Sequence, residues 1–495
     1  MNNIENQFSE FLIRNSNITI NTISKHYGLT SSQLNLYSQI LNWNLISENI
    51  NINWSEEIIE DFKEFLNWEI LSLNPKLPWS FALIKKFEKN WDFGRLYHDK
   101  GLNSNSNIPW TIEILDEYKE VWNWSILSSS NYLPWDEELI QKFKEKWSWY
   151  SLCKNESIPW QNNFIEIFYN YIEWELICSN KSFPWTEKLV EKYSEKIVWT
   201  SLANNKGFLW TEEFIIKIIN LKFENKEDLF LKELCENQYL PWTENLVEIF
   251  INKINKIKWG SNSKYSMRPD ILIKALTMNN SLPLSIEFIK KHKSFWNKSD
   301  FTTISLSWVD YYDIFRENLQ WKSLSKGIHS LIYTEELIEE YKDIWDWTLD
   351  GMASNKFLPW TMDFVDKYSD KLEWRRKFTN YNIFDNNCIP WTANFIEKHK
   401  KKVNFKTLSK NIKLDWNIEF IRKYKNKFDW SCAYNIGMSS NPSLPWNEEF
   451  VLEFEPLLEI SSFSSSYNMI SYRVIIPFIL RTDINNILDN IKAKK

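Results

Sequence analysis

The residues with the greatest potential for chemistry in this 495-residue chain are five histidines, five cysteines and many carboxylates. His98 precedes Asp99, and such a pair can serve as a general base with the group that orients it. The histidines, however, are scattered over different parts of the sequence. A polar surface pair is therefore the simpler interpretation of His98 and Asp99.

The cysteines also lack a catalytic or metal-binding arrangement. Cys153, Cys178 and Cys235 share one position of a repeat, which favours a small residue where two helices approach closely. The spacing matches neither a zinc site nor a disulfide framework, so a reducing compartment is expected. The sequence motifs of metalloproteases, serine hydrolases, P-loops and dinucleotide-binding proteins are absent. We expect no catalysis, no cofactor and no metal.

A repeat organises the sequence around these residues. Pro134-Trp135 returns as Pro159-Trp160 after 25 residues and again as Pro184-Trp185. Asp136 follows the first Trp at a position where a carboxylate can cap a helix N-terminus. Equivalent capping residues recur in other units: Thr30, Ser55, Ser80, Thr111, Thr186, Thr211, Thr243, Thr334, Thr361 and Thr392, with Gln161 as the exception.

Within one unit, apolar spacing predicts two helices. Leu139 and Trp147 lie on one face of helix A, about 11 residues long, which follows the Pro-Trp turn. The chain is expected to bend near Ser148, and a shorter helix B follows from Trp149. Asn155 is predicted in a left-handed conformation at the end of helix B. One longer helix per unit remains an alternative.

The predicted fold is all-α, an elongated α-solenoid or superhelical array of about 16 tandem two-helix repeats. Short helices with aromatic faces are unstable alone, and stacking neighbouring repeats would bury those faces in a continuous core. The tryptophans at the two recurring positions are the predicted core: Trp54, Trp68, Trp79, Trp110, Trp124, Trp135, Trp149, Trp160, Trp174, Trp185, Trp199, Trp360, Trp374, Trp391 and Trp430.

Departures from the repeat suggest five regions. Residues 1–53 are predicted to be degenerate capping repeats, although residues 23–30 also resemble a helix-turn-helix. Regular repeats fill 54–259, degenerate repeats with an inserted loop at 260–270 fill 260–332, and further regular repeats fill 333–460. Residues 461–495 are expected to form a C-terminal cap, since terminal repeats of solenoids are atypical.

Bulk properties limit the function classes. The chain has 29 Trp but only 8 Gly, which argues against phosphate-binding loops. Its net charge of -6 lacks the basic character of most nucleic-acid-binding proteins. The N-terminus lacks the form of a secretory signal, and no apolar run is long enough to span a membrane. We expect a cytoplasmic protein without a membrane segment.

The expected function is that of a non-catalytic scaffold which binds a protein or peptide along a concave groove. Positions that vary between repeats are the candidates for partner binding. They include two basic clusters suited to an acidic partner, and the full set is Arg95, Tyr97, His98, Tyr150, Glu175, Arg375, Arg376 and Lys377. Single-stranded nucleic acid, read repeat by repeat, and glycans bound by exposed Trp are the alternatives.

Overall fold

The regular secondary structure is all helical in the part of the chain that the computed structural model describes. That part comprises residues 3–94, 101–161, 163–220, 227–256, 269–279, 281–296, 307–315, 319, 321–327, 331–375, 382–431, 437–459 and 471–494. These residues form 31 α-helices with short 3-10 and π segments and no β-strand, only two isolated bridges. The expected loop at 260–270 falls almost entirely outside this part.

Two compact units make up the chain. Unit 1 contains residues 1–109, 117–122 and 347–495, and unit 2 contains residues 110–116 and 123–346. The helices of unit 1 are α1 (Asn3–Arg14), α2 (Ser16–His26), α3 (Ser31–Leu36), α4 (Trp43–Glu48), α5 (Glu56–Asp61), α6 (Trp68–Leu71), α7 (Phe81–Lys86), α25 (Met362–Lys367), α26 (Ala393–Lys398), α27 (Phe405–Leu408), α28 (Ile418–Tyr424), α29 (Glu448–Phe454), α30 (Ile476–Arg481) and α31 (Asn485–Lys494).

Unit 2 has longer helices in its later part. Helix α8 (Ile112–Glu117) crosses the boundary between the units. The remaining helices are α9 (Trp124–Ser129), α10 (Glu137–Lys142), α11 (Trp149–Lys154), α12 (Phe164–Ile167), α13 (Trp174–Ser179), α14 (Glu187–Lys192), α15 (Trp199–Ala203), α16 (Glu212–Ile219), α17 (Glu227–Glu236), α18 (Glu244–Lys256), α19 (Pro269–Thr277), α20 (Ile286–Lys291), α21 (Lys293–Trp296), α22 (Trp308–Phe315), α23 (Trp321–Lys326) and α24 (Glu335–Glu340).

One repeat consists of a helix A, such as α10, and a helix B, such as α11. The expected length of helix A was wrong for this unit, because α10 spans six residues, as does α11. The α-helix stops early because the N–H of Lys146 bonds back only three residues, to the carbonyl of Phe143. Ser148 is extended, with φ -76° and ψ 100°, which confirms the predicted bend.

The predicted N-caps of helix A are confirmed. The Asp136 carboxylate accepts a hydrogen bond from the Leu139 N–H at 2.7 Å, and Thr30 forms a capping box with Gln33. Where Gln161 replaces the capping residue, α12 has no side-chain cap and is only four residues long. The same side-chain cap is present at Ser55, Ser80, Thr111, Thr186, Thr211, Thr243, Thr334, Thr361 and Thr392.

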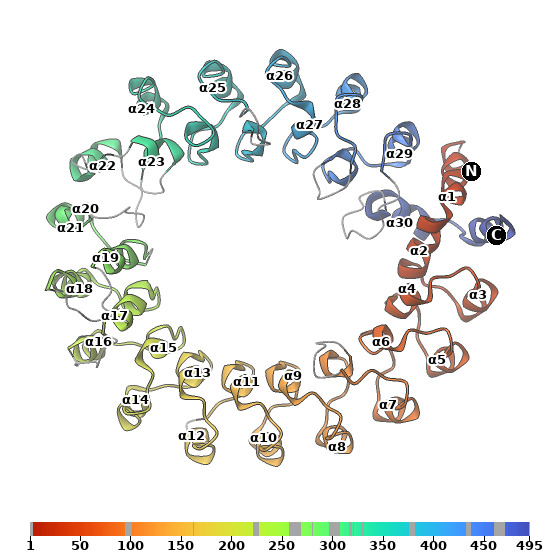
Figure 1. The fold of residues 1–495 in the computed structure, drawn as a ribbon, viewed down its shortest axis with the longest axis horizontal. Helices are drawn as coiled ribbons and strands as arrows, with labels where there is room; N and C mark the ends of the chain where they lie inside the picture. Colours follow the sequence, from red (N-terminus) through yellow and green to blue (C-terminus); the bar gives the residue numbers. More distant parts are fainter. Residues whose placement is uncertain are drawn as a thin grey trace. The chain divides into compact units, whose positions relative to one another are not determined.

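Helices A and B form two rows within unit 2. The B helices α9, α11, α13, α15, α17 and α19 each contact the next along the chain (Figure 1). The A helices α10, α12, α14 and α16 form the other row. In each unit we call the helices A row A and the helices B row B. Neighbouring repeats therefore provide the lateral support that six-residue helices require, because such helices are unstable in isolation.

The recurring tryptophans differ in exposure between the two positions. Among the described indoles after the Pro-Trp turn, Trp79 and Trp446 are half-buried and the others are buried. At most of these positions the indole N–H donates to a carbonyl five residues earlier, as from Trp160 to Asn155 at 3.1 Å, whereas Trp185 donates to Ile177, eight residues earlier, at 3.0 Å. Of the predicted core indoles at the start of helix B, the five from Trp68 to Trp199 are only half-buried. Buried are Trp54, Trp110, Trp135, Trp160, Trp185, Trp360, Trp374, Trp391 and Trp430; half-buried are Trp68, Trp79, Trp124, Trp149, Trp174 and Trp199.

Buried asparagines at the end of helix B link successive repeats. Asn180 Nδ2 donates to the carbonyls of Cys153 and Asn155 in the preceding repeat, at 2.9 and 3.2 Å. Its Oδ1 accepts from the Ser182 N–H at 2.8 Å. We call this series the asparagine ladder; its members are Asn49, Asn74, Asn105, Asn155, Asn180, Asn205, Asn237, Asn279, Asn386, Asn411 and Asn441.

The ladder explains why one conformational prediction was wrong. Asn155 is extended, with φ -74° and ψ 113°, and is not left-handed. Its carboxamide is required for bonds to Ser128 and Ser130, so the side chain rather than backbone tolerance accounts for asparagine here.

The small-residue position in helix B also accepts a hydrogen bond. Ser128 Oγ accepts from the backbone N–H of Ser148, 20 residues later, at 2.9 Å. Cys153 Sγ receives the equivalent bond from Glu173 at 3.4 Å. The position thus satisfies the N–H that precedes the next helix B, a group with no partner inside that helix.

We expect the buried cysteines to be unreactive in the native protein. Burial raises the pKa of the Cys153 and Cys178 thiols to about 12, and it also raises that of Cys235. The thiolate is the reactive form, so a disulfide reagent such as DTNB should label exposed Cys388 and leave these three unmodified. Peptide mass mapping would read the result. Labelling of Cys153 as fast as Cys388 would contradict it.

The first and last helices of the chain pack together within unit 1. Helix α1 contacts α29 and α31, and α2 contacts α30 (Figure 1). The rings of Phe8 and Phe478 meet edge to face with centroids 4.8 Å apart, and both side chains are buried. Arg14 pairs with Glu455 at 3.0 Å. We call this contact the terminal seam, and it places the segment expected to be a C-terminal cap against the N-terminal helices.

Polar groups complete the terminal seam. The Tyr37 hydroxyl donates to Asp489 at 3.0 Å, and Gln33 donates to Asn485 at 3.0 Å. Burial raises the pKa of Tyr37 to about 12, with the Asp489 bond contributing in the same direction. Tyr37 is therefore a neutral hydrogen-bond donor at neutral pH, and the seam combines an apolar centre with a polar margin.

Candidate functional site

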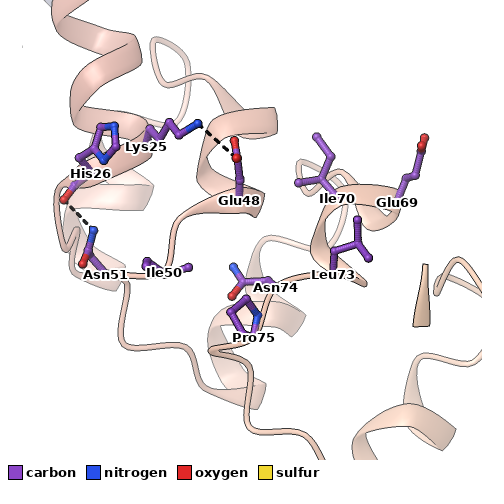
Figure 2. A pocket seen from close by; sticks show the side chains of 10 residues that line it. All are labelled: Lys25, His26, Glu48, Ile50, Asn51, Glu69, Ile70, Leu73, Asn74 and Pro75. Carbon is purple, nitrogen blue, oxygen red and sulfur yellow. Dashed lines mark hydrogen bonds and ion pairs between the residues drawn. The ribbon is translucent and has the colours of Figure 1, made fainter. Parts of the chain in front are cut away.

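Pockets in the two units occupy the same part of the repeat, where helices B end. The first pocket, in unit 1, has a volume of about 540 Å³ and lies between α2, α4 and α6 (Figure 2). The second pocket, in unit 2, has a volume of about 640 Å³ and lies between α17 and α19. Each pocket is lined by one residue of the asparagine ladder, Asn74 or Asn279. The ladder therefore fixes the spacing between the helices that form the walls.

The walls of the first pocket are held by hydrogen bonds from asparagine side chains to backbone carbonyls of the preceding repeat. Asn51 Nδ2 donates to the His26 carbonyl at 3.0 Å, and Asn74 Nδ2 donates to the Ser47 carbonyl at 2.9 Å. Gly28 lies close to this wall, since a Cβ there would be 2.8 Å from the Asn51 carbonyl oxygen. The turn after α2 and the turn after α4 are thus in direct contact, and the pocket is preformed.

The lining of the first pocket is apolar with charges at its margin. Ile50 is 50% exposed, and Ile70, Leu73 and Pro75 contribute further apolar surface. Lys25 and Glu48 form an ion pair at 3.2 Å. Figure 2 shows the Glu48 and Glu69 side chains on either side of Ile70.

His26 contributes little positive charge to this lining. Burial lowers its pKa, and neighbouring Lys25 lowers it further, while Glu48 opposes the shift. At pH 7 the imidazole is therefore predominantly neutral. Lys25 therefore supplies the one full positive charge of this lining, whereas Glu48 and Glu69 supply two negative charges.

The second pocket has the opposite balance of charge. Lys232 pairs with Glu236 at 2.7 Å, and Lys274 adds a second positive charge. Ile271 and Met278 form its apolar surface, and Met278 is 52% exposed. The two pockets share their place in the repeat and their apolar component, but they differ in the sign of the excess charge.

Three of the residues predicted to bind a partner are described by the structure, namely Tyr150, Glu175 and Arg375, and these three line neither pocket. Tyr150 and Glu175 lie exposed on the row B helices α11 and α13, at the repeat position that Glu69 occupies in α6. Tyr150 accepts a hydrogen bond from Lys154, whose Nζ lies 4.0 Å from the ring centroid. Arg375 is exposed, and its backbone forms an isolated β-bridge with Asn382. Arg95, Tyr97, His98, Arg376 and Lys377 lie outside the described residues.

Sequence reasoning missed the residues that line the pockets. Glu69 was not among the residues predicted to bind a partner, although it occupies the repeat position of Tyr150 and Glu175. Ile50 and Met278 carry a usable signal, because each is an apolar residue directly beside a ladder asparagine. Such a residue cannot pack in the core next to the ladder side chain and is left at the surface.

The two pocket linings consist of apolar, amide, imidazole and charged side chains. Neither lining contains a serine, threonine or cysteine that a neighbouring base could activate. Among the described residues, no group of three His, Cys, Asp or Glu side chains is arranged to hold a metal. None of the described helices combines the length and apolarity that crossing a membrane requires.

Comparison of the chain with protein-family models, with curated proteins and with solved structures gave no match in any of the three.

Proposed function

We propose that this helical-repeat protein is a non-catalytic solenoid scaffold that binds an extended segment of a protein partner along row B. The observation that carries the proposal is the recurrence of a preformed, partly apolar pocket at the ends of helices B in both units. Pockets that bury apolar side chains and orient a few polar groups provide most of the binding energy in such interfaces. The unpaired thiols favour a reducing, cytoplasmic location.

The charge arrangement favours a protein over a nucleic acid. Lysines of row A pair with carboxylates of the preceding repeat, as in Lys192–Glu166 and Lys217–Glu191, both at 2.6 Å. Lys423–Glu397, at 2.7 Å, repeats the pattern in unit 1. These lysines are matched by acidic side chains, whereas phosphate binding requires an excess of basic groups.

A peptide-display selection on the full chain tests the proposal. We expect Ile50→Asp and Met278→Asp each to weaken binding of a subset of selected peptides by at least about tenfold, since each places a charge in an apolar contact. Val121→Asp and Ile344→Asp are matched controls, because those side chains are 50% and 52% exposed but lie outside the pockets. The proposal would be overturned if every selected peptide bound both pocket variants as tightly as it binds the wild type.

The same selection also tests the prediction that Arg375 binds an acidic partner. Arg375→Glu should weaken only those peptides that carry acidic residues, if the prediction made from the sequence is right. Equal binding of acidic peptides to this variant and to the wild type would contradict that prediction and leave the pockets unaffected.

A further inference from the structure

We propose that the first pocket binds an arginine side chain of the partner, with the aliphatic stem on Ile50, Ile70 and Leu73 and the guanidinium between Glu48 and Glu69. This inference rests on the proposed function and assigns a ligand chemistry to one of its pockets. It follows from the pocket's shape, its apolar lining and the sign of its charge.

The carboxylates provide the polar part of the site. Figure 2 shows them at the same margin of the pocket, separated by Ile70. Glu48 forms an exposed ion pair with Lys25, and exposed ion pairs contribute little stabilising free energy in water. Glu69 forms no ion pair with any residue that the structure describes. A cation that enters between the two carboxylates can therefore bind Glu69 and share Glu48.

Arginine fits the remaining features better than lysine does. Its planar guanidinium presents five N–H donors, and the two carboxylates at the pocket margin come from different helices, α4 and α6. It is also more weakly hydrated than an ammonium group and leaves its stem free to cover apolar surface. The neutral state of His26 keeps a second positive charge away from the ligand.

The second pocket supplies a comparison within the same molecule. Lys232 and Lys274 outnumber Glu236 among its charged lining residues. An arginine would meet a net positive charge there, although the apolar surface is similar. The proposal therefore assigns arginine selectivity to the first pocket and not to row B in general.

The test uses the full chain with labelled isoleucine methyl groups and Nα-acetyl-arginine methylamide as the probe. We expect saturable chemical-shift changes at Ile50 and Ile70, with millimolar affinity, and no saturable change at Ile271. The uncharged norleucine analogue should bind at least fivefold more weakly. Glu69→Gln should weaken the arginine probe threefold to tenfold, because it removes charge and keeps shape.

Glu57→Gln is the matched control, since Glu57 is an exposed carboxylate on α5 and lies outside the pocket. Binding should be unchanged in that variant. Equal affinity for the arginine and norleucine probes, or an unaltered affinity in Glu69→Gln, would overturn the arginine assignment.

Failure of the arginine assignment is distinguishable from failure of the scaffold. If peptides without arginine bind more weakly to Ile50→Asp than to the wild type, the arginine assignment is overturned and the scaffold proposal is supported. If no displayed peptide depends on Ile50 or Met278, the scaffold proposal is overturned whatever the probe does.

Discussion

Replacing Asn205 with alanine is expected to lower the free energy of unfolding of its repeat by about 3–5 kcal/mol. Asn205 is fully buried, and its Nδ2 donates to the carbonyls of Cys178 and Asn180 at 2.8 and 2.9 Å. Its Oδ1 accepts from the N–H groups of Gly207 and Phe208 at 2.7 and 3.0 Å. Alanine leaves all four backbone groups without these partners.

The adjacent residue provides the control for this prediction. Asn204 is exposed and bonds to Glu233 at 2.6 Å, so Asn204→Ala should change the free energy of unfolding by less than about 0.5 kcal/mol. Asn205→Asp keeps the acceptor oxygens but loses both donors, and it should be as destabilising as alanine. Denaturant unfolding and amide exchange near residues 178–208 would measure the effects. Similar values for the Asn204 and Asn205 variants would contradict the role of the ladder.

Phe478→Ala is expected to open the terminal seam, with a loss of about 3–5 kcal/mol in the local free energy of unfolding. Phe478 is 1% exposed and its ring lies against Phe8, while neighbouring Ile475 and Ile479 are buried as well. Alanine removes the ring contact and leaves a cavity between α1 and α30. Faster amide exchange in α1, α2, α30 and α31 would report the opening.

Leu480 is the matched control for Phe478. It lies on the same helix but is 59% exposed, so Leu480→Ala should leave exchange in α1 unchanged. A double-mutant cycle with Phe8→Ala should give a coupling energy of about 0.5–1.5 kcal/mol, typical of an aromatic pair. Additive effects of the two substitutions would show that the rings do not stabilise each other.

Local features of the fold were predictable because their causes lie within a few residues. Asp136 and its equivalents cap the helices that follow, and the change of apolar face near Ser148 marks the bend. The length of helix A was overestimated, since apolar spacing continues to Trp147 through turns that are no longer α-helical. Periodicity reports which side chains face the core, but it does not distinguish a helix from successive turns.

The asparagine ladder was overlooked although its period is visible in the sequence. Asn155, Asn180 and Asn205 recur every 25 residues. Their role depends on carbonyls of the preceding repeat, and no local rule relates a side chain to an acceptor 25 or 27 residues away. The terminal seam depends similarly on which elements meet in space, so Phe478 could not be recognised in advance. Ile50 could be recognised only by its place beside Asn49, after the role of that asparagine is known.

The ladder bonds are retained where the sequence between repeats is lengthened. Asn74 reaches back 27 residues to Ser47, whereas the corresponding bonds of Asn105, Asn237 and Asn279 span 33, 34 and 44 residues. Extra residues therefore enter between successive repeats without changing how those repeats stack. Such tolerance makes these intervals suitable for grafting epitopes or reporter peptides, because an added segment there leaves the carboxamide bonds between the repeats in place.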